Sequence, residues 1–321
     1  MQPIQGLHHV TAVAREPQRN IDFYRNILGQ RLVKRTVNFD VPDTYHFYFA
    51  DETGTPGSVL TFFAWPNTRR GVRGNAETNA VAYNIPAGSL AAFWQSHLAR
   101  NGIKLKDVEK RFGQSVLQFE DPDGMLVELV ESESPDSIRH WAAGPIPQAY
   151  ALRGFHSVTL WLDQVEPTAN LLTQHMGYTA AGNEDNRYRF IGNAAAPGHI
   201  VDLVHRPGKA EAGFGSGSIH HIAFRVPNDA EQVEYQDSIR GAGFRVTEVM
   251  DRSYFHSIYF REPGGVLFEI ATDTPGFATD EPADALGESL RLPAWHEPNR
   301  AAIEQGLLPI TLKPIEKAAN Q

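Results

Sequence analysis

The sequence Leu7-His8-His9-Val10 returns almost unchanged as Ile219-His220-His221-Ile222, two-thirds of the way along the chain. The second copy is followed by Gly264-Gly265-Val266-Leu267-Phe268-Glu269-Ile270, an apolar run that reads as a last strand carrying one carboxylate. Together the three stretches offer two imidazoles and one carboxylate. This set of ligands suits a divalent metal ion held on one face, with the opposite face open to substrate and dioxygen.

Around these stretches, one order of elements recurs four times. In the first copy, an alternating strand leads into a helix-like stretch from Pro17 to Leu28, and three more alternating strands follow. If residues 9, 80, 156 and 221 are equivalent, the spacings are 71, 76 and 65 residues, which indicates an internal repeat. The sequence therefore predicts an α+β fold built from four βαβββ modules.

Composition restricts the function classes. The 321 residues are 41% hydrophobic, enough to bury a sizeable core, and the formal net charge of -9 argues against a nucleic-acid or anionic-membrane surface. The chain contains no cysteine, so a bound metal would have only nitrogen and oxygen ligands. Without an apolar run of membrane-spanning length or a leader-like start, we expect a cytoplasmic protein, and the sequence leaves a homo-oligomer open.

The four-module order and the double-histidine stretches resemble the vicinal oxygen chelate superfamily, which includes glyoxalases, bleomycin resistance proteins and extradiol dioxygenases. A narrower resemblance, to its hydroquinone-type ring-cleaving dioxygenases, covers nearly the whole chain. It rests on these stretches: His8-His9-Val10-Thr11, Gly29-Gln30-Arg31-Leu32-Val33-Lys34-Arg35-Thr36, Tyr45-His46-Phe47-Tyr48-Phe49-Ala50-Asp51-Glu52-Thr53-Gly54-Thr55-Pro56-Gly57 and Arg111-Phe112-Gly113-Gln114.

The resemblance implies two curled, cup-shaped mixed sheets and an iron(II) ion, or manganese(II), bound by His9, His221 and Glu269. It also implies acid-base and substrate-binding roles, which fall on four residues: His8, His220, Arg252 and Tyr259. The partners would be a small aromatic diol, such as a hydroquinone, and dioxygen. Glu269 supports the ligand assignment independently, because an unpaired carboxylate buried in its apolar run would be costly.

Two packing arrangements of the modules remain open. The positions expected to face the cups are, module by module, His9 and Phe62, Ala80 and Glu128, His156 and Asp202, and His221 and Glu269. If the third and fourth modules pair, the site is a four-ligand, glyoxalase-like one made from His156, Asp202, His221 and Glu269, which would suit zinc or nickel. If the first pairs with the fourth, the site is His9, His221 and Glu269, with apolar Phe62 in place of a fourth ligand. The resemblance favours the second arrangement.

Further expectations concern organisation. Modules one and two are predicted in residues 1–135, a linker in 136–152, and modules three and four with a tail in 153–321, with a short helix from Pro298 to Gln305. His8 and His220 should point away from His9 and His221 in ideal strands, unless a bulge re-aims them. The alternative functions are a metal-dependent glyoxalase-type isomerase or thiol transferase, and a non-catalytic binder of a small molecule.

Overall fold

Each of the four modules folds as one strand, one helical segment and three further strands. The computed structural model describes residues 2–132 and 138–316. Module one comprises β1 (Leu7–Ala14), α1 (Pro17–Ile21) with a π-helical turn (Asp22–Ile27), β2 (Arg31–Val37), β3 (Tyr45–Ala50) and β4 (Val59–Ala64). Module two comprises β5 (Glu77–Ile85), a π-helical turn (Leu90–Trp94) running into α2 (Gln95–Arg100), β6 (Glu109–Arg111), β7 (Gln114–Glu120) and β8 (Leu126–Glu131).

The second half of the chain repeats this order. Module three comprises β9 (Phe155–Leu162), α3 (Glu166–His175), β10 (Thr179–Glu184), β11 (Arg187–Ile191) and β12 (Ile200–His205). Module four comprises β13 (Ile219–Val226), α4 (Asp229–Gly241), β14 (Met250–Asp251), β15 (Phe255–Arg261) and β16 (Leu267–Pro275). The tail holds three short 3-10 turns (Phe277–Thr279, Ala283–Ala285, Glu297–Asn299) and α5 (Arg300–Gly306), close to the predicted helix.

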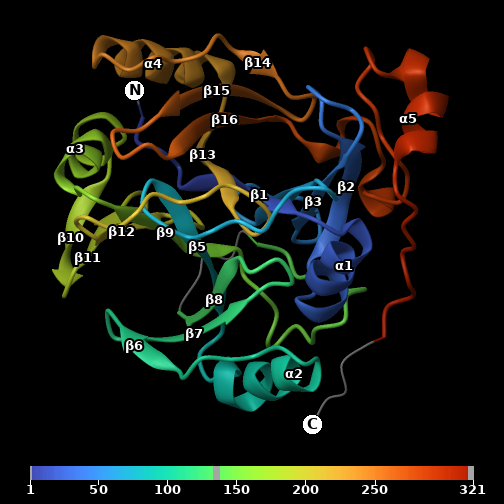
Figure 1. The fold of residues 1–321 in the computed structure, drawn as a ribbon, viewed down its shortest axis with the longest axis horizontal. Coiled ribbons are helices and arrows are strands. Elements are labelled where there is room, and N and C mark those ends of the chain that lie inside the picture. The colour runs from blue at the N-terminus through green and yellow to red at the C-terminus, as the bar shows by residue number, and fades with distance from the viewer. Residues whose placement is uncertain (1, 133–137, 317–321) are drawn as a thin grey trace.

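The strands form two eight-stranded mixed sheets (Figure 1). Their orders are β14-β15-β16-β13-β1-β4-β3-β2 and β10-β11-β12-β9-β5-β8-β7-β6. The first sheet therefore joins modules one and four, and the second joins modules two and three. This is the second of the two arrangements considered above. The α+β vicinal oxygen chelate fold is confirmed.

Each sheet takes one module from each half of the chain, so the division into residues 1–135 and 153–321 remains a proposal about sequence order. The predicted boundary between residues 135 and 136 lies outside the described residues.

A single cluster of buried side chains contains residues of both sheets, including Val10 and Phe62 of the first and Val81 and Phe155 of the second. The two sheets therefore share one hydrophobic core.

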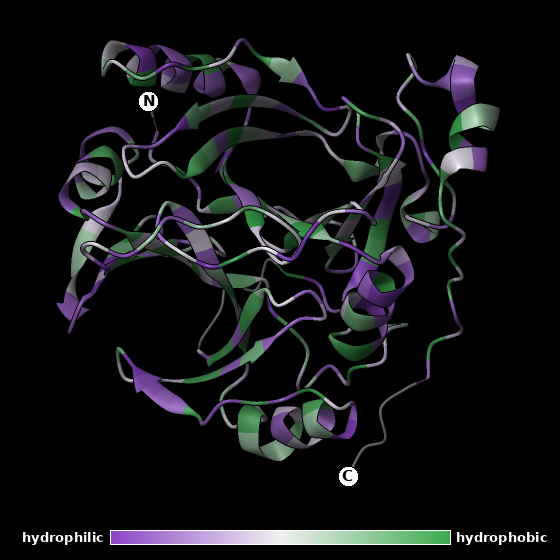
Figure 2. Ribbon diagram, viewed as in Figure 1, coloured by the Kyte–Doolittle hydropathy of each residue, from purple (hydrophilic) through white to green (hydrophobic). Residues whose placement is uncertain are grey.

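The helices pack on the sheet faces opposite the cups, where helical side chains such as Tyr24 and Tyr235 join the shared core. Figure 2 shows mixed hydrophilic and hydrophobic residues along them, as expected for helices that bury one side only. Within residues 2–132 and 138–316, no helix combines the length and hydropathy needed to cross a bilayer.

The tail runs along β2 and α1 (Figure 1). It is anchored there by Lys34 of β2, which is fully buried and pairs with Asp280 and Glu281.

Candidate metal centre

His9 and His221 lie side by side at the centre of the first sheet, where β1 and β13 run antiparallel. The register places Thr11 opposite His221 and His9 opposite Ala223, so the two histidines are diagonal neighbours on one face. Their Nε2 atoms are 3.3 Å apart. Residues separated by 212 positions in the sequence thus present two imidazole nitrogens to the same point.

Each of these strands carries a β-bulge at the first histidine of its doublet. The extra residue is His8 on β1 and His220 on β13. The bulge re-aims both rings, so His8 Nδ1 lies 2.9 Å from His9 Nδ1, and His220 Nδ1 lies 2.7 Å from His221 Nδ1. The expectation that these rings point away applied to ideal strands, and the structure shows the stated exception, a bulge that re-aims each ring.

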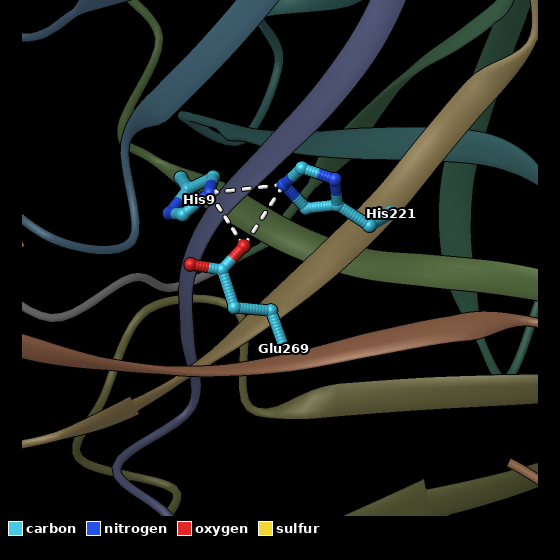
Figure 3. A group of neighbouring side chains, drawn as sticks. All are labelled: His9, His221 and Glu269. Carbon is cyan, nitrogen blue, oxygen red and sulfur yellow. Dashed lines mark hydrogen bonds and ion pairs between the residues drawn. The ribbon is translucent and has the colours of Figure 1, made fainter. Parts of the chain in front are cut away.

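Glu269 completes a triangle with the two histidines (Figure 3). It lies on β16, parallel to β13 and paired with Ala223. Glu269 Oε2 is 2.9 Å from His221 Nε2 and 3.3 Å from His9 Nε2. The three residues are buried, and Glu269 is fully so.

These three residues fit a metal ion. Ligand atoms that share an ion at about 2.1 Å, at right angles or at the tetrahedral angle, lie about 3.0–3.4 Å apart, and the sides of the triangle are 2.9–3.3 Å. Glu269 Oε2 is buried and has no well-aligned hydrogen bond among the described residues. A cation at this point would provide the missing partner for that oxygen. The contacts at Nδ1 also leave Nε2 of His9 and of His221 as the nitrogens facing it.

A serine holds the other oxygen of the carboxylate. Ser257 on β15 is fully buried and its hydroxyl donates to Glu269 Oε1. Burial by itself would raise the pKa of Glu269, but the facing imidazoles of His9 and His221 bring that pKa well below its ordinary value. The carboxylate is therefore ionised. By holding Oε1, Ser257 turns Oε2 of Glu269 towards the histidines. Sequence reasoning missed Ser257, although it lies two residues before Tyr259 on the same face of β15.

Arg252 and Tyr259 lie together beside the triangle. Arg252 follows β14, and its Nε donates to the hydroxyl of Tyr259 over 3.3 Å. The rings of Tyr259 and His221 are 5.7 Å apart. Burial, followed by the charge of Glu269, raises the pKa of Tyr259 above its ordinary value, so its hydroxyl keeps its proton at neutral pH.

A cavity of about 230 Å³ opens next to His9 and His221. This volume lies below the roughly 300–1,000 Å³ of common small-molecule sites, which suits a single-ring ligand. The cavity is lined mainly by aromatic and polar side chains: His9, Thr11, Asn38, Phe39, Asp40, His46, Tyr48, Phe63, Trp65, His220, His221, Arg252, Phe255, Tyr259 and Leu267. His8 is absent from this lining. Its ring packs on Phe255 at 5.0 Å, behind His9.

His46 and Tyr48 are cavity residues to which sequence reasoning gave no role. His46 Nε2 is 2.9 Å from Thr61 Oγ1, and His46 Nδ1 is 3.0 Å from the hydroxyl of Tyr48. A signal was present in the sequence, because His46 and Tyr48 alternate along β3 with Phe47 and Phe49, which belong to the core. That alternation indicates one polar and one apolar face.

The family model of the "Glyoxalase/Bleomycin resistance protein/Dioxygenase superfamily" matches residues 6–129 and 154–270. The chain belongs to this superfamily. One similar protein is the "Putative ring-cleaving dioxygenase MhqO" of Bacillus subtilis (strain 168), 44% identical over 97% of this chain and 98% of the relative. Another is the "Chlorohydroquinone/hydroquinone 1,2-dioxygenase" of Sphingobium indicum, 36% identical over 90% of this chain and 91% of the relative.

Solved structures of the superfamily agree with the fold. The crystal structure of a "putative dioxygenase" from Bacillus subtilis subsp. subtilis str. 168 superposes with a TM-score of 0.93 at 42% identity, covering 98% of this chain and 100% of the other. Glyoxalase I from Zea mays superposes with a TM-score of 0.63 at 13% identity, covering 84% of this chain and 92% of the other. The second likeness concerns the fold alone.

The second sheet repeats the strand bulges of the first. Their positions show that one predicted equivalence between the modules, that of His156, is wrong. The first strands of modules two and three also carry bulges, at Asn79 and His156. His156 therefore corresponds to His8 and His220, and Ser157 corresponds to His221. The repeat reading was off by one residue, because motif matching aligns histidine with histidine and the bulge position is invisible in the sequence.

The counterpart of Glu269 in the first module was also misplaced by one residue. Thr61, not Phe62, pairs with Thr11 and faces the cavity side, where it contacts His46. Phe62 points to the other face of the sheet, with its ring 4.6 Å from that of Tyr24. A hydroxyl thus occupies the position where the sequence predicted an apolar ring.

The second cup holds ion pairs where the first holds the triangle. Asp202 accepts from Arg189 at 2.8 and 2.9 Å, and Glu128 accepts from Arg111 at 2.8 Å. His156 Nε2 lies 3.1 Å from Gln114 Oε1 in the same sheet. The glyoxalase-like ligand set is therefore not assembled, because His156 and Asp202 belong to one sheet and His221 and Glu269 to the other.

Proposed function

We propose that this protein is an iron(II)-dependent, extradiol-type ring-cleaving dioxygenase that acts on a hydroquinone or a related aromatic diol. One observation supports this proposal above the others. The triangle formed by His9, His221 and Glu269 borders an aromatic-lined cavity, so a ring and a gas molecule could reach an ion held there. The names of the two relatives point to the same reaction class.

Bound iron(II) would supply the redox chemistry that lets dioxygen react with an aromatic diol. The protein residues would do the remaining work. Phe63, Trp65 and Phe255 would pack against the ring and exclude water. The reaction would break one ring carbon–carbon bond and place both atoms of dioxygen in the product.

Proton handling falls to His220, Tyr259 and Arg252. Burial and the neighbouring His221 lower the pKa of His220 to about 3, so its ring is neutral near pH 7. Its Nδ1 would accept the proton on Nδ1 of His221, which leaves the Nε2–H of the neutral His220 ring to donate a hydrogen bond to a substrate oxygen in the cavity. Tyr259 carries a proton it can donate, and the guanidinium of Arg252 would stabilise an anionic oxygen on the ring.

The test is oxygen consumption by anaerobically iron-loaded protein across a panel of hydroquinones and catechols, with the mass of the product measured. We expect uptake of one dioxygen per ring cleaved. His221→Ala and Glu269→Ala should lose both stoichiometric iron and oxygen uptake while remaining folded. A protein that binds iron at this site but consumes no oxygen with any diol would refute the proposal.

Arg252→Ala and Tyr259→Phe separate turnover from metal binding. Both should keep near-normal iron content, because neither residue belongs to the triangle. Turnover should fall by about two to four orders of magnitude, the usual contribution of general acid-base and electrostatic assistance. Unchanged turnover in both variants would show that Arg252 and Tyr259 contribute only to packing.

A further inference from the structure

The mouth of the cavity holds an ion pair between Arg252 and Asp40. Arg252 Nη1 lies 3.4 Å from both carboxylate oxygens of Asp40. Among the described residues that line the cavity, these two are the one Arg or Lys and the one Asp or Glu. The Arg252 side chain is 18% exposed and that of Asp40 is 65% exposed, so the guanidinium extends from the cavity to its outer rim.

Asp40 is held in this position by its own loop and by the tail. The loop connects β2 to β3, and Asn38 Oδ1 accepts the backbone N–H of Asp40 over 3.0 Å. On the outer side, His296 Nε2 lies 2.9 Å from the carbonyl oxygen of Phe39. The carboxylate is therefore presented to the entrance by a supported turn.

We propose that Asp40 is a specificity-determining residue, which selects diols without an acidic ring substituent. This inference rests on the proposed function and narrows its substrate class. Asp40 already pairs with Nη1 of Arg252, the cation that a substrate carboxylate would otherwise pair with. A ring that carries a carboxylate would bring a second negative charge beside Asp40. A ring with an uncharged substituent meets apolar walls instead, at Phe63, Trp65 and Leu267.

The size of the effect follows from exposure. Like charges a few ångströms apart at a protein surface interact weakly, and solvent and salt screen them. We therefore expect Asp40 to shift the preference between a carboxylated and an uncharged diol by about three- to tenfold at low salt. The shift should shrink at high ionic strength, whereas an effect of shape would persist.

The experiment compares Asp40→Asn with Asp43→Asn. Asp43 lies in the same loop, is exposed and does not line the cavity, so its substitution makes the same charge change away from the site. The probes are hydroquinone and gentisate, which is a hydroquinone with a ring carboxylate. Anaerobic calorimetric titration, with and without iron(II), gives their dissociation constants, and kcat/KM for both is measured in air.

Asp40→Asn should raise the preference for gentisate over hydroquinone by about three- to tenfold in binding and in kcat/KM, and Asp43→Asn should leave it unchanged. An unchanged ratio in Asp40→Asn, or an equal shift in both variants, would overturn the inference. The dissociation constants alone test the inference about Asp40, even if no diol is cleaved. Absence of hydroquinone cleavage by the iron-loaded wild type would instead count against the proposed function.

Discussion

His9 and His221 present Nε2 to Glu269 because the Nδ1 of each ring already contacts the histidine before it. A metal-binding imidazole must offer an unprotonated nitrogen, so a partner at the other nitrogen fixes both tautomer and ring orientation. In the proposed metal centre, the doubled histidines would therefore form two pairs, each made of a ligand and the histidine that orients it. His220 also lines the cavity, whereas His8 does not and would act only through His9.

The ligand assignment predicts different outcomes for two histidines. His9→Ala should lose stoichiometric iron, since two remaining ligands cannot hold the facial geometry. His156→Ala should keep iron, because His156 lies in the other sheet and contacts Gln114. Iron content after dialysis, measured on both variants side by side, checks this. Loss of iron from His156→Ala and retention in His9→Ala would reverse the assignment.

Ser257 allows a test of how the carboxylate is oriented. Ser257→Ala removes the hydroxyl that holds Glu269 Oε1, so we expect metal affinity to fall by about 10- to 100-fold without loss of the fold. Ser157→Ala is the matched control, because Ser157 is similarly buried but belongs to the second sheet. Competition with a metal-sensitive dye gives both affinities. Equal affinities in the two variants would show that Ser257 only fills space.

The three triangle residues were predictable from sequence because each has a local signal. His9 and His221 stand in a repeated stretch, and Glu269 is a carboxylate inside an apolar run. The bulges left no such signal, since a bulge depends on the register between β1 and β13, which come from opposite ends of the chain. The same one-residue uncertainty explains why Thr61 was overlooked.

At the level of elements, the number and order of strands followed from alternation, whereas helix geometry did not. The predicted helix from Pro17 to Leu28 is a short α-helix that continues as a π-helical turn. Adjacent Phe23 and Tyr24 are both buried in that turn, which a period of 3.6 residues does not anticipate. The packing of two neighbouring aromatic side chains into one core overrides the regular period.

The tail is the element that supports the cavity rim. The ring of Trp295 lies 5.8 Å from that of Phe39, which lines the cavity, and His296 contacts the Phe39 carbonyl oxygen. The double variant Trp295→Ala/His296→Ala should loosen residues 38–44 and raise KM several-fold. Hydrogen exchange of that loop and steady-state kinetics measure the two effects.

Arg300→Ala provides the control for the tail. Arg300 contacts Glu297, Glu304 and the carbonyl oxygen of Leu290, all within the tail. We expect its loss to change neither exchange in residues 38–44 nor KM. If the Trp295/His296 variant exchanged as slowly as wild type in that loop, the tail would have no supporting role at the rim.

At the level of the whole molecule, the two cups differ in which groups neutralise their buried carboxylates. Each buries a carboxylate on the last strand of a module: Glu269 in the first cup, Glu128 and Asp202 in the second. A buried carboxylate needs a cation. The second cup supplies guanidinium groups from its own strands, whereas the first leaves two imidazoles facing its carboxylate. The arrangement of the described residues in the first cup therefore fits an external cation, as proposed above.

Arg189→Met tests this division of roles, because it removes the main partner of Asp202. Breaking a buried ion pair from one side costs about 3–5 kcal/mol, so urea unfolding should shift strongly, although the bond from Arg187 to Asp202 remains and moderates the loss. Arg189→Met/Asp202→Leu should cost less than the sum of the two single variants, by about 1–3 kcal/mol. Iron affinity should stay at the wild-type value in each folded variant, because the triangle lies in the other sheet. Additive losses would show that Arg189 does not stabilise the buried Asp202. Iron affinity that falls with Arg189→Met would show that the second cup is coupled to the metal centre rather than a separate, structural counterpart of it.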